Sequence, residues 1–257
     1  MTDPQTTDTA AKTDSFAREA WEIAKTLIVA GAIALALRIF VFQPYTIPSS
    51  SMEPGLRTGD YVVVWKGSYG YSRASVPFNP PLPGGRVLFR QPHRGDVIVF
   101  RLPRDPTQVY VKRLIGLPGD RVQIKAGQVF VNGAAIPQQP QDFVEDPEAP
   151  GRRVREILEP RPDSRRYVTY DAGPGHDGDD TDVYVVPAGH YFFMGDNRDN
   201  SLDSRWPREA DGVDFVPAEN LIGKVEIVMV SWNAGASILK PWTWLDLRAS
   251  RLFKPVV

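Results

Sequence analysis

Residues 109–116 read Val-Tyr-Val-Lys-Arg-Leu-Ile-Gly and are followed by the turn Leu117-Pro118-Gly119-Asp120. A short run of β-branched and aromatic residues that ends at a Pro-Gly turn predicts a β-strand. Because successive side chains of a strand point to opposite faces, Lys112 lies on one face and Arg113 on the other. Whichever face is buried, a cation is drawn toward an apolar environment. Only the lysine can lose its proton there, since arginine stays charged.

Seven further runs of the same kind indicate that most of the chain after Pro44 is β structure. They cover residues 61–65, 97–100, 121–124, 129–131, 183–186, 191–194 and 224–230. Turn signals separate them, such as Gly-Asp at 95–96 and Asn-Gly at 132–133. The pattern predicts a mostly β fold with an antiparallel, barrel-like sheet. Two stretches interrupt it, at 67–92 and at about 137–182, and we interpret both as long inserted loops or an inserted subdomain.

Composition excludes several classes of protein. The 257 residues include no cysteine, which excludes disulfide scaffolds, zinc-thiolate sites and iron-sulfur sites. The 30 Lys and Arg residues against 31 Asp and Glu residues offer no case for binding nucleic acid, which normally needs a basic patch. We expect no cofactor and no metal.

One apolar run is long enough to cross a membrane. Residues 26–42 would span roughly 25 Å as a helix, and their one charged residue, Arg38, can reach the head groups at the outer end. Basic residues precede this run, so the positive-inside rule places the N-terminus in the cytoplasm. We therefore predict a cytoplasmic polar tail at 1–25, disordered over 1–15, a transmembrane anchor at 26–42 and an exterior domain at 43–257. A cleaved signal peptide and a buried soluble helix are the alternatives.

A serine cluster follows the apolar run, where a nucleophile could act on a substrate delivered at the membrane surface. It reads Ile-Pro-Ser-Ser-Ser-Met-Glu-Pro at residues 47–54. A serine nucleophile needs a base, but His93, His176 and His190 lie in turns or just before a strand, and we interpret them as surface residues. Lys112 is the alternative base, provided that burial holds its amine neutral near pH 7.

A polar segment at residues 195–205 could support such a lysine. It reads Gly-Asp-Asn-Arg-Asp-Asn-Ser-Leu-Asp-Ser-Arg. An EF-hand calcium loop that began at its first aspartate would need Gly at the sixth position and Glu at the twelfth, where this chain has serine and proline. The segment suits instead a turn with an Asp203 to Arg205 charge network, in which the hydroxyl of Ser201 or Ser204 orients the lysine amine.

Taken together, these segments resemble the type I signal peptidases, a family of bacterial membrane-anchored serine proteases. The matching stretches are residues 48–54, 94–100, 110–120 and 195–205, in the family's order and directly after its N-terminal anchor. The resemblance covers roughly residues 26–230, although Ser50 stands where glycine is common. It implies an endopeptidase that removes signal peptides from exported preproteins after small-x-small (Ala-x-Ala) sites, through an acyl-enzyme formed by a Ser-Lys dyad.

The resemblance also implies roles for individual residues. Ser51 takes the place of the nucleophile and Lys112 that of the general base. Ser49 resembles the side-chain donor of the oxyanion hole, and Ser201 resembles the hydroxyl that orients the lysine. The remaining matches are the charge pair Asp203 and Arg205, which shapes the site, and the substrate-pocket residues Ile47, Leu56, Tyr110 and Val111.

The partners implied by the resemblance are signal peptides and the lipid bilayer. We expect a single-pass protein of the bacterial inner (cytoplasmic) membrane with its catalytic domain on the periplasmic face, where Trp65, Phe78 and Phe89 contact lipid. Two alternatives stay open. One is a specialised peptidase of the same fold that serves a single secretion or conjugation system. The other is a non-catalytic, membrane-tethered β binding module, which would be excluded if peptide cleavage requires Ser51 and Lys112.

Overall fold

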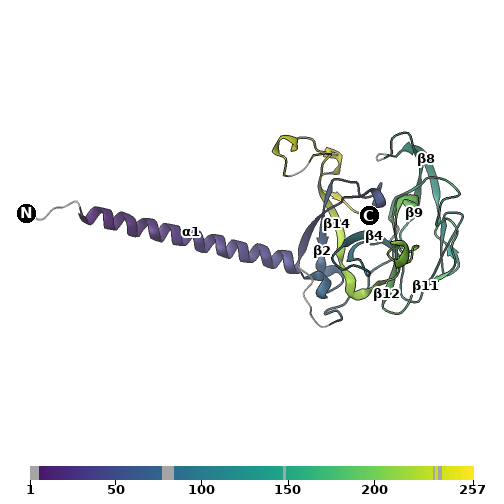
Figure 1. The fold of residues 1–257 in the computed structure, drawn as a ribbon, viewed down its shortest axis with the longest axis horizontal. Helices are drawn as coiled ribbons and strands as arrows, with labels where there is room; N and C mark the ends of the chain where they lie inside the picture. The colour runs from purple at the N-terminus through teal and green to yellow at the C-terminus, as the bar shows by residue number, and fades with distance from the viewer. Residues whose placement is uncertain (1–5, 77–83, 147–148, 234, 237–238) are drawn as a thin grey trace, which may run out of the picture. The chain divides into compact units, whose positions relative to one another are not determined.

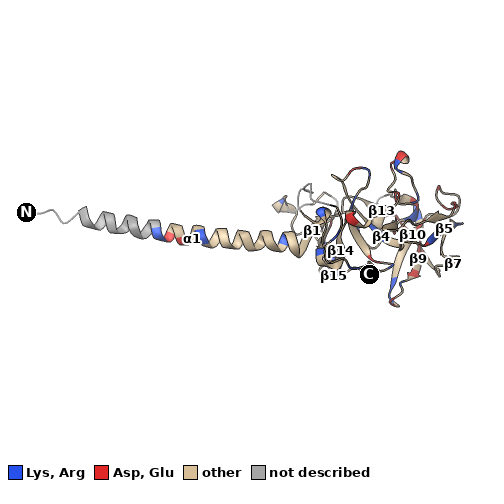
Figure 2. Ribbon diagram, turned by 90° about the horizontal axis from the view of Figure 1, so that it is seen from below, with Lys and Arg blue, Asp and Glu red and all other residues tan. Residues whose placement is uncertain are grey.

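The structure is a computed structural model that describes residues 6–76, 84–146, 149–233, 235–236 and 239–257, and it divides into residues 1–41 and 42–257 (Figure 1). The first unit carries one helix, α1 (Thr6–Phe40). Residues 18–40 of this helix are long and apolar enough to cross a membrane, and charged residues lie only toward the two ends of that part (Figure 2). A single N-terminal apolar helix fits a membrane-anchored protein.

The helix begins earlier than we expected. We predicted disorder over residues 1–15, but α1 is helical from Thr6 onward. Extending an existing helix costs much less than nucleating one, and the apolar run supplies the nucleus. Ala10 and Ala11, which have the highest helix propensity, favour this extension toward the N-terminus.

The second unit is built on an eight-stranded antiparallel sheet. Its order is β1-β2-β14-β3-β4-β12-β13, with β15 paired to β14. The strands are β1 (Phe42–Thr46), β2 (Asp60–Trp65), β3 (Val97–Arg101), β4 (Val109–Gly116), β12 (His190–Met194), β13 (Val216–Pro217), β14 (Leu221–Ser231) and β15 (Lys254–Pro255). This sheet curls around its core (Figure 1). The predicted mostly β fold with one apolar N-terminal helix is therefore confirmed.

Two smaller sheets complete the unit. One has the order β11-β5-β6-β7 and the other β10-β9-β8. Their strands are β5 (Arg121–Lys125), β6 (Gln128–Val131), β7 (Ala134–Ala135), β8 (Gln139–Glu145), β9 (Arg153–Pro160), β10 (Arg166–Asp171) and β11 (Tyr184–Val185). The short 3-10 helices are η1 (Ser50–Met52), η2 (Lys66–Ser68), η3 (Arg73–Ser75), η4 (Arg198–Asn200), η5 (Arg208–Ala210), η6 (Ala218–Asn220), η7 (Pro241–Thr243) and η8 (Ala249–Arg251).

The predicted insertion at 137–182 therefore carries a sheet of its own, β8-β9-β10, which we call the inserted sheet. Strand β9 buries Val154, Ile157 and Glu159, which do not follow a strict two-residue repeat, whereas β8 is mostly exposed. A strand with few buried apolar residues shows little of the alternation on which strand prediction depends. The stretch at 67–92 contains η2, η3 and an isolated bridge between Tyr71 and Val87.

From Lys112 onward, strand β4 is buried on both faces. Leu114 packs into a cluster with Ile98 and Phe193, while Ile115 packs on the other side with Val122 and other residues. The two cations that precede them, Lys112 and Arg113, are 3% and 1% exposed. Both faces of β4 therefore carry a cation into the interior, and each must be either neutral or paired there.

Candidate active site

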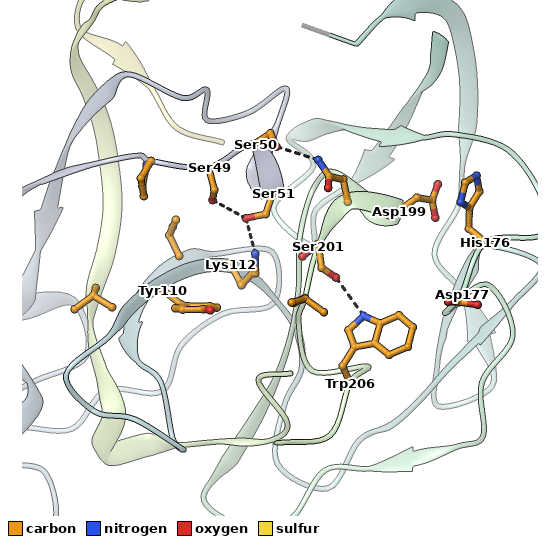
Figure 3. Close-up of a pocket in the computed structure, with 15 residues that line it drawn as sticks. Ser49, Ser50, Ser51, Tyr110, Lys112, His176, Asp177, Asp199, Ser201 and Trp206 are labelled. Atoms are coloured by element: carbon orange, nitrogen blue, oxygen red, sulfur yellow. Dashed lines mark hydrogen bonds between the residues drawn. The ribbon is translucent and has the colours of Figure 1, made fainter. Parts of the chain in front are cut away.

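Ser51 and Lys112 meet at one cavity of about 650 Å³ (Figure 3). The Nζ atom of Lys112 lies 2.5 Å from the Oγ atom of Ser51. Ser51 belongs to η1, a tight turn in which the Glu53 N-H donates to the Ser50 carbonyl at 2.9 Å. Met52 in this turn is buried in the core and anchors the turn there, while Ser51 lines the cavity.

The side chain of Lys112 is buried although it lines the cavity. Burial lowers the pKa of Lys112 to about 8, against the opposing effect of the Asp203 carboxylate, and Arg205 lowers it further. Desolvation disfavours the charged form of a buried lysine. A substantial fraction of the amine is therefore neutral near pH 8, as a general base requires.

The two other serines that we predicted for the site also line this cavity. Ser49 is exposed, and its Oγ lies 3.4 Å from the Ser51 Oγ, so the hydroxyls are neighbours (Figure 3). Ser201 is 8% exposed, and its Oγ has no hydrogen-bond partner among the described residues. The structure thus brings Ser201 to the cavity without a hydrogen bond to Lys112.

The predicted charge pair is present and buried. The Arg205 Nε and Nη2 atoms donate to the two carboxylate oxygens of Asp203, both at 2.9 Å. Asp203 also accepts the backbone N-H of Gly195 at 2.9 Å. Burial alone would raise the pKa of Asp203, but Arg205 and these hydrogen bonds lower it overall. Asp203 therefore stays ionised and holds the segment that begins at Gly195.

That segment packs directly against η1, the turn that carries Ser51. The Asn197 N-H donates to the Ser51 carbonyl at 3.2 Å, and the Asn200 side chain donates to the Ser50 Oγ at 2.9 Å. A Cβ on Gly195 would collide with the Ser51 carbonyl oxygen, so glycine is required there. Ser50, which departs from the family's usual glycine, thus uses its hydroxyl to bind this segment.

The four predicted substrate-pocket residues separate into two groups. Tyr110 and Val111 line the cavity beside Lys112. Ile47 and Leu56 are 4% and 0% exposed, pack in the core cluster with Met52, and are not part of the cavity wall. They support η1 from the inside.

Sequence reasoning missed several residues of the cavity wall. Those that we did not assign to a site are Pro48, Ser50, Val109, His176, Asp177, Asp199, Asn200, Leu202 and Trp206. Asp177 and His176, the latter expected at the surface, are exposed and lie on the side of the cavity away from Tyr110 (Figure 3). They follow the inserted sheet, and no local sequence signal connects them with Ser51. Among the described residues, no group of three or more His, Asp or Glu side chains is arranged to hold a metal.

Comparison with known proteins gives consistent matches. The family model for "Signal peptidase, peptidase S26" matches residues 20–232. The chain is 36% identical over 266 residues to the Signal peptidase I of Rickettsia canadensis, with 96% of each protein covered. It is 39% identical over 242 residues to that of Rickettsia typhi, covering 86% of this chain and 88% of the relative.

A crystal structure of a signal peptidase I from Enterococcus faecalis is also similar, at 25% sequence identity and a TM-score of 0.32. The match covers 53% of this chain and 97% of that one. The family model spans most of the chain, and the relatives align with it almost from end to end. The chain therefore belongs to the type I signal peptidases of the peptidase S26 family.

Proposed function

We propose that this chain cuts signal peptides from exported preproteins after small-x-small sites, with Ser51 as the nucleophile and Lys112 as the general base. The observation that carries the proposal is the 2.5 Å separation of the Ser51 Oγ and the Lys112 Nζ within one cavity. The lowered pKa of Lys112 supports it, because the amine can be neutral at mildly alkaline pH.

In the acylation step, neutral Lys112 accepts the Ser51 proton while the Ser51 Oγ attacks the scissile carbonyl carbon. The negative charge that develops on the carbonyl oxygen is stabilised by the Ser51 backbone N-H and the Ser49 hydroxyl, which is 3.4 Å from the nucleophile. The Lys112 ammonium then protonates the leaving amine as the C-N bond breaks. The mature protein departs, and the signal peptide stays bound to Ser51 as an ester.

In the deacylation step, Lys112 is neutral again and accepts a proton from water. The hydroxide attacks the ester carbonyl, and the Ser51 oxygen leaves and recovers its proton from Lys112. The same two side chains thus serve both halves of the reaction. No cofactor takes part in this mechanism.

The edge of β4 supports an extended binding mode for the substrate. Strand β12 pairs with β4 only from Arg113 onward, so residues 109–112 have no strand partner on that side among the described residues. An extended peptide can add to such an edge through its backbone. Tyr110 and Val111 would then face the peptide, and short substrate side chains would let its backbone approach Ser51.

The topology that we propose has a cytoplasmic N-terminus and a periplasmic catalytic domain, as the distribution of basic residues favours.

Of the side chains expected to contact lipid, Trp65 and Phe89 are exposed, and Phe78 lies outside the described residues. Trp242 and Leu245, at 81% and 97% exposed, extend the set of apolar side chains that could enter a membrane surface.

The test is cleavage of a precursor with an Ala-x-Ala site by the full chain in detergent, followed by mass spectrometry. We expect cleavage after the second Ala, and a rate reduced by more than about 1,000-fold in Ser51→Ala and Lys112→Ala. The exposed residues Ser250 and Lys125 provide matched alanine controls that should keep the wild-type rate. A folded wild type that leaves the precursor intact would favour the binding-module alternative.

A further inference from the structure

The inserted sheet places one carboxylate in the interior of the domain. Glu159, on β9, is fully buried and forms two hydrogen bonds with the Arg198 guanidinium, at 2.8 and 2.5 Å. The same carboxylate accepts the Tyr167 hydroxyl at 2.7 Å and the Gln138 amide at 3.1 Å. Burial alone would raise the pKa of Glu159, but Arg198 and these hydrogen bonds lower it overall, so the pair is ionised.

Arg198 connects this pair to the segment at residues 195–205. Its Nε donates to the carbonyl of Gly195 at 3.3 Å, and its own carbonyl accepts from the Arg205 Nη2 at 2.5 Å. Arg205 in turn binds Asp203, which accepts the Gly195 N-H. Both backbone polar groups of Gly195 are therefore hydrogen-bonded, the N-H to Asp203 and the carbonyl to Arg198.

Gly195 touches η1, the turn that carries Ser51. Its Cα is so close to the Ser51 carbonyl and the Ser201 hydroxyl that an added Cβ would collide with both. Two residues further on, the Asn197 N-H donates to the Ser51 carbonyl. A shift of Gly195 toward these groups would therefore displace Ser51 or Ser201, and a shift away from them would remove their support.

We propose that Glu159 is a positioning residue for peptide hydrolysis, which acts through Arg198 and Gly195 to fix Ser51 against Lys112. The proposal rests on the proposed function of the Ser51–Lys112 dyad. It gives the inserted sheet a role in the reaction, because β9 supplies Glu159, the anion that pairs with Arg198 in the segment at residues 195–205. A buried ion pair can also act on stability alone, so the test separates the two roles.

The experiment compares Glu159→Gln with Glu156→Gln in the full chain, in detergent, with the precursor substrate. Glu156 lies on the same strand and is only partly buried, so it controls for the loss of a carboxylate from the inserted sheet. A displacement of a reacting atom by about 1 Å can cost 10²-fold, so we expect kcat of Glu159→Gln to fall by about 10- to 100-fold. KM should stay within about twofold, because Tyr110 and Val111 are untouched.

A second variant, Arg198→Lys, keeps a cation beside Glu159 but loses the Nε donor to Gly195. We expect kcat to fall in this variant while the circular dichroism spectrum stays that of the wild type. An unchanged kcat in either folded variant would overturn the proposal, as would a fall shared by Glu156→Gln or a loss of folding in both variants. The wild type and Ser51→Ala are measured in parallel: if Ser51→Ala still cleaves, the dyad itself is refuted, whatever Glu159 does.

Discussion

Replacement of Lys112 by methionine should abolish cleavage and yet make the protein more stable. The wild-type lysine is buried, and burial lowers its pKa from 10.5 to about 8. That difference corresponds to about 3 kcal/mol of unfavourable free energy in the folded state at pH 7. Methionine removes this cost but also loses the hydrogen bond to Ser51, worth about 1 kcal/mol, so we expect a net gain of about 2 kcal/mol.

The gain should depend on pH in a defined direction. Below about pH 8, Lys112 is protonated in both the folded and the unfolded chain, and the full cost of the buried charge is present. Between about pH 8 and 10.5 the folded protein releases this proton while the unfolded chain keeps it, so the wild type becomes more stable as the pH rises. The advantage of the variant should therefore be largest at neutral pH and vanish toward pH 10.5.

Thermal unfolding followed by circular dichroism in detergent measures the effect. A gain of about 2 kcal/mol corresponds to an increase in Tm of about 4 to 8 °C for a domain of this size. Lys125→Met serves as the control, because Lys125 is exposed on β5 and its replacement should leave Tm nearly unchanged. A Tm of Lys112→Met at or below the wild-type value at pH 7, or a gain that persists at pH 10.5, would refute the reasoning.

Three further predictions concern the reaction. In wild-type enzyme kcat/KM should rise about tenfold from pH 7 to pH 9, as the neutral fraction of a base with a pKa of about 8 grows from roughly one-tenth to nine-tenths; a flat profile would contradict it. Ser49→Ala should lower kcat by about 100-fold with little change in KM, and a loss of less than threefold would exclude Ser49 from the oxyanion hole. Gly195→Ala should lose both cleavage and thermal stability, because its Cβ would collide with the Ser51 carbonyl; wild-type activity would show that this contact can relax.

Apolar periodicity was enough to predict most of the main sheet. Strands such as β4 and β12 are short apolar runs between turn signals, and they are buried because of that composition. The same reasoning failed for β9, where one buried position is Glu159. A charged residue at a buried position breaks the alternation, and the Arg198 that compensates it is remote in sequence. Such a strand can be predicted only once the position of the compensating Arg198 is known.

The site was predictable to a similar extent. The sequence indicated that a cation on β4 enters the interior, and the resemblance connected Lys112 with Ser51, which the structure places 2.5 Å apart. The sequence did not indicate that Ile47 and Leu56 lie in the core or that His176 reaches the cavity wall. Those placements depend on how η1 and the residues that follow the inserted sheet pack against the main sheet, which no local pattern records.

The same packing explains why burial prevails at Lys112. Asp203 and Asp196 both raise the pKa of Lys112, because each carboxylate favours the protonated amine. Each carboxylate, however, already binds an arginine through both oxygens, Asp203 with Arg205 and Asp196 with Arg113. A carboxylate neutralised in this way attracts a second cation only weakly, so desolvation decides the protonation state of the amine. The buried ion pairs around the cavity therefore do more than stabilise the fold: in the part of the chain that the structure describes, both carboxylates that favour the charged lysine are already paired with an arginine.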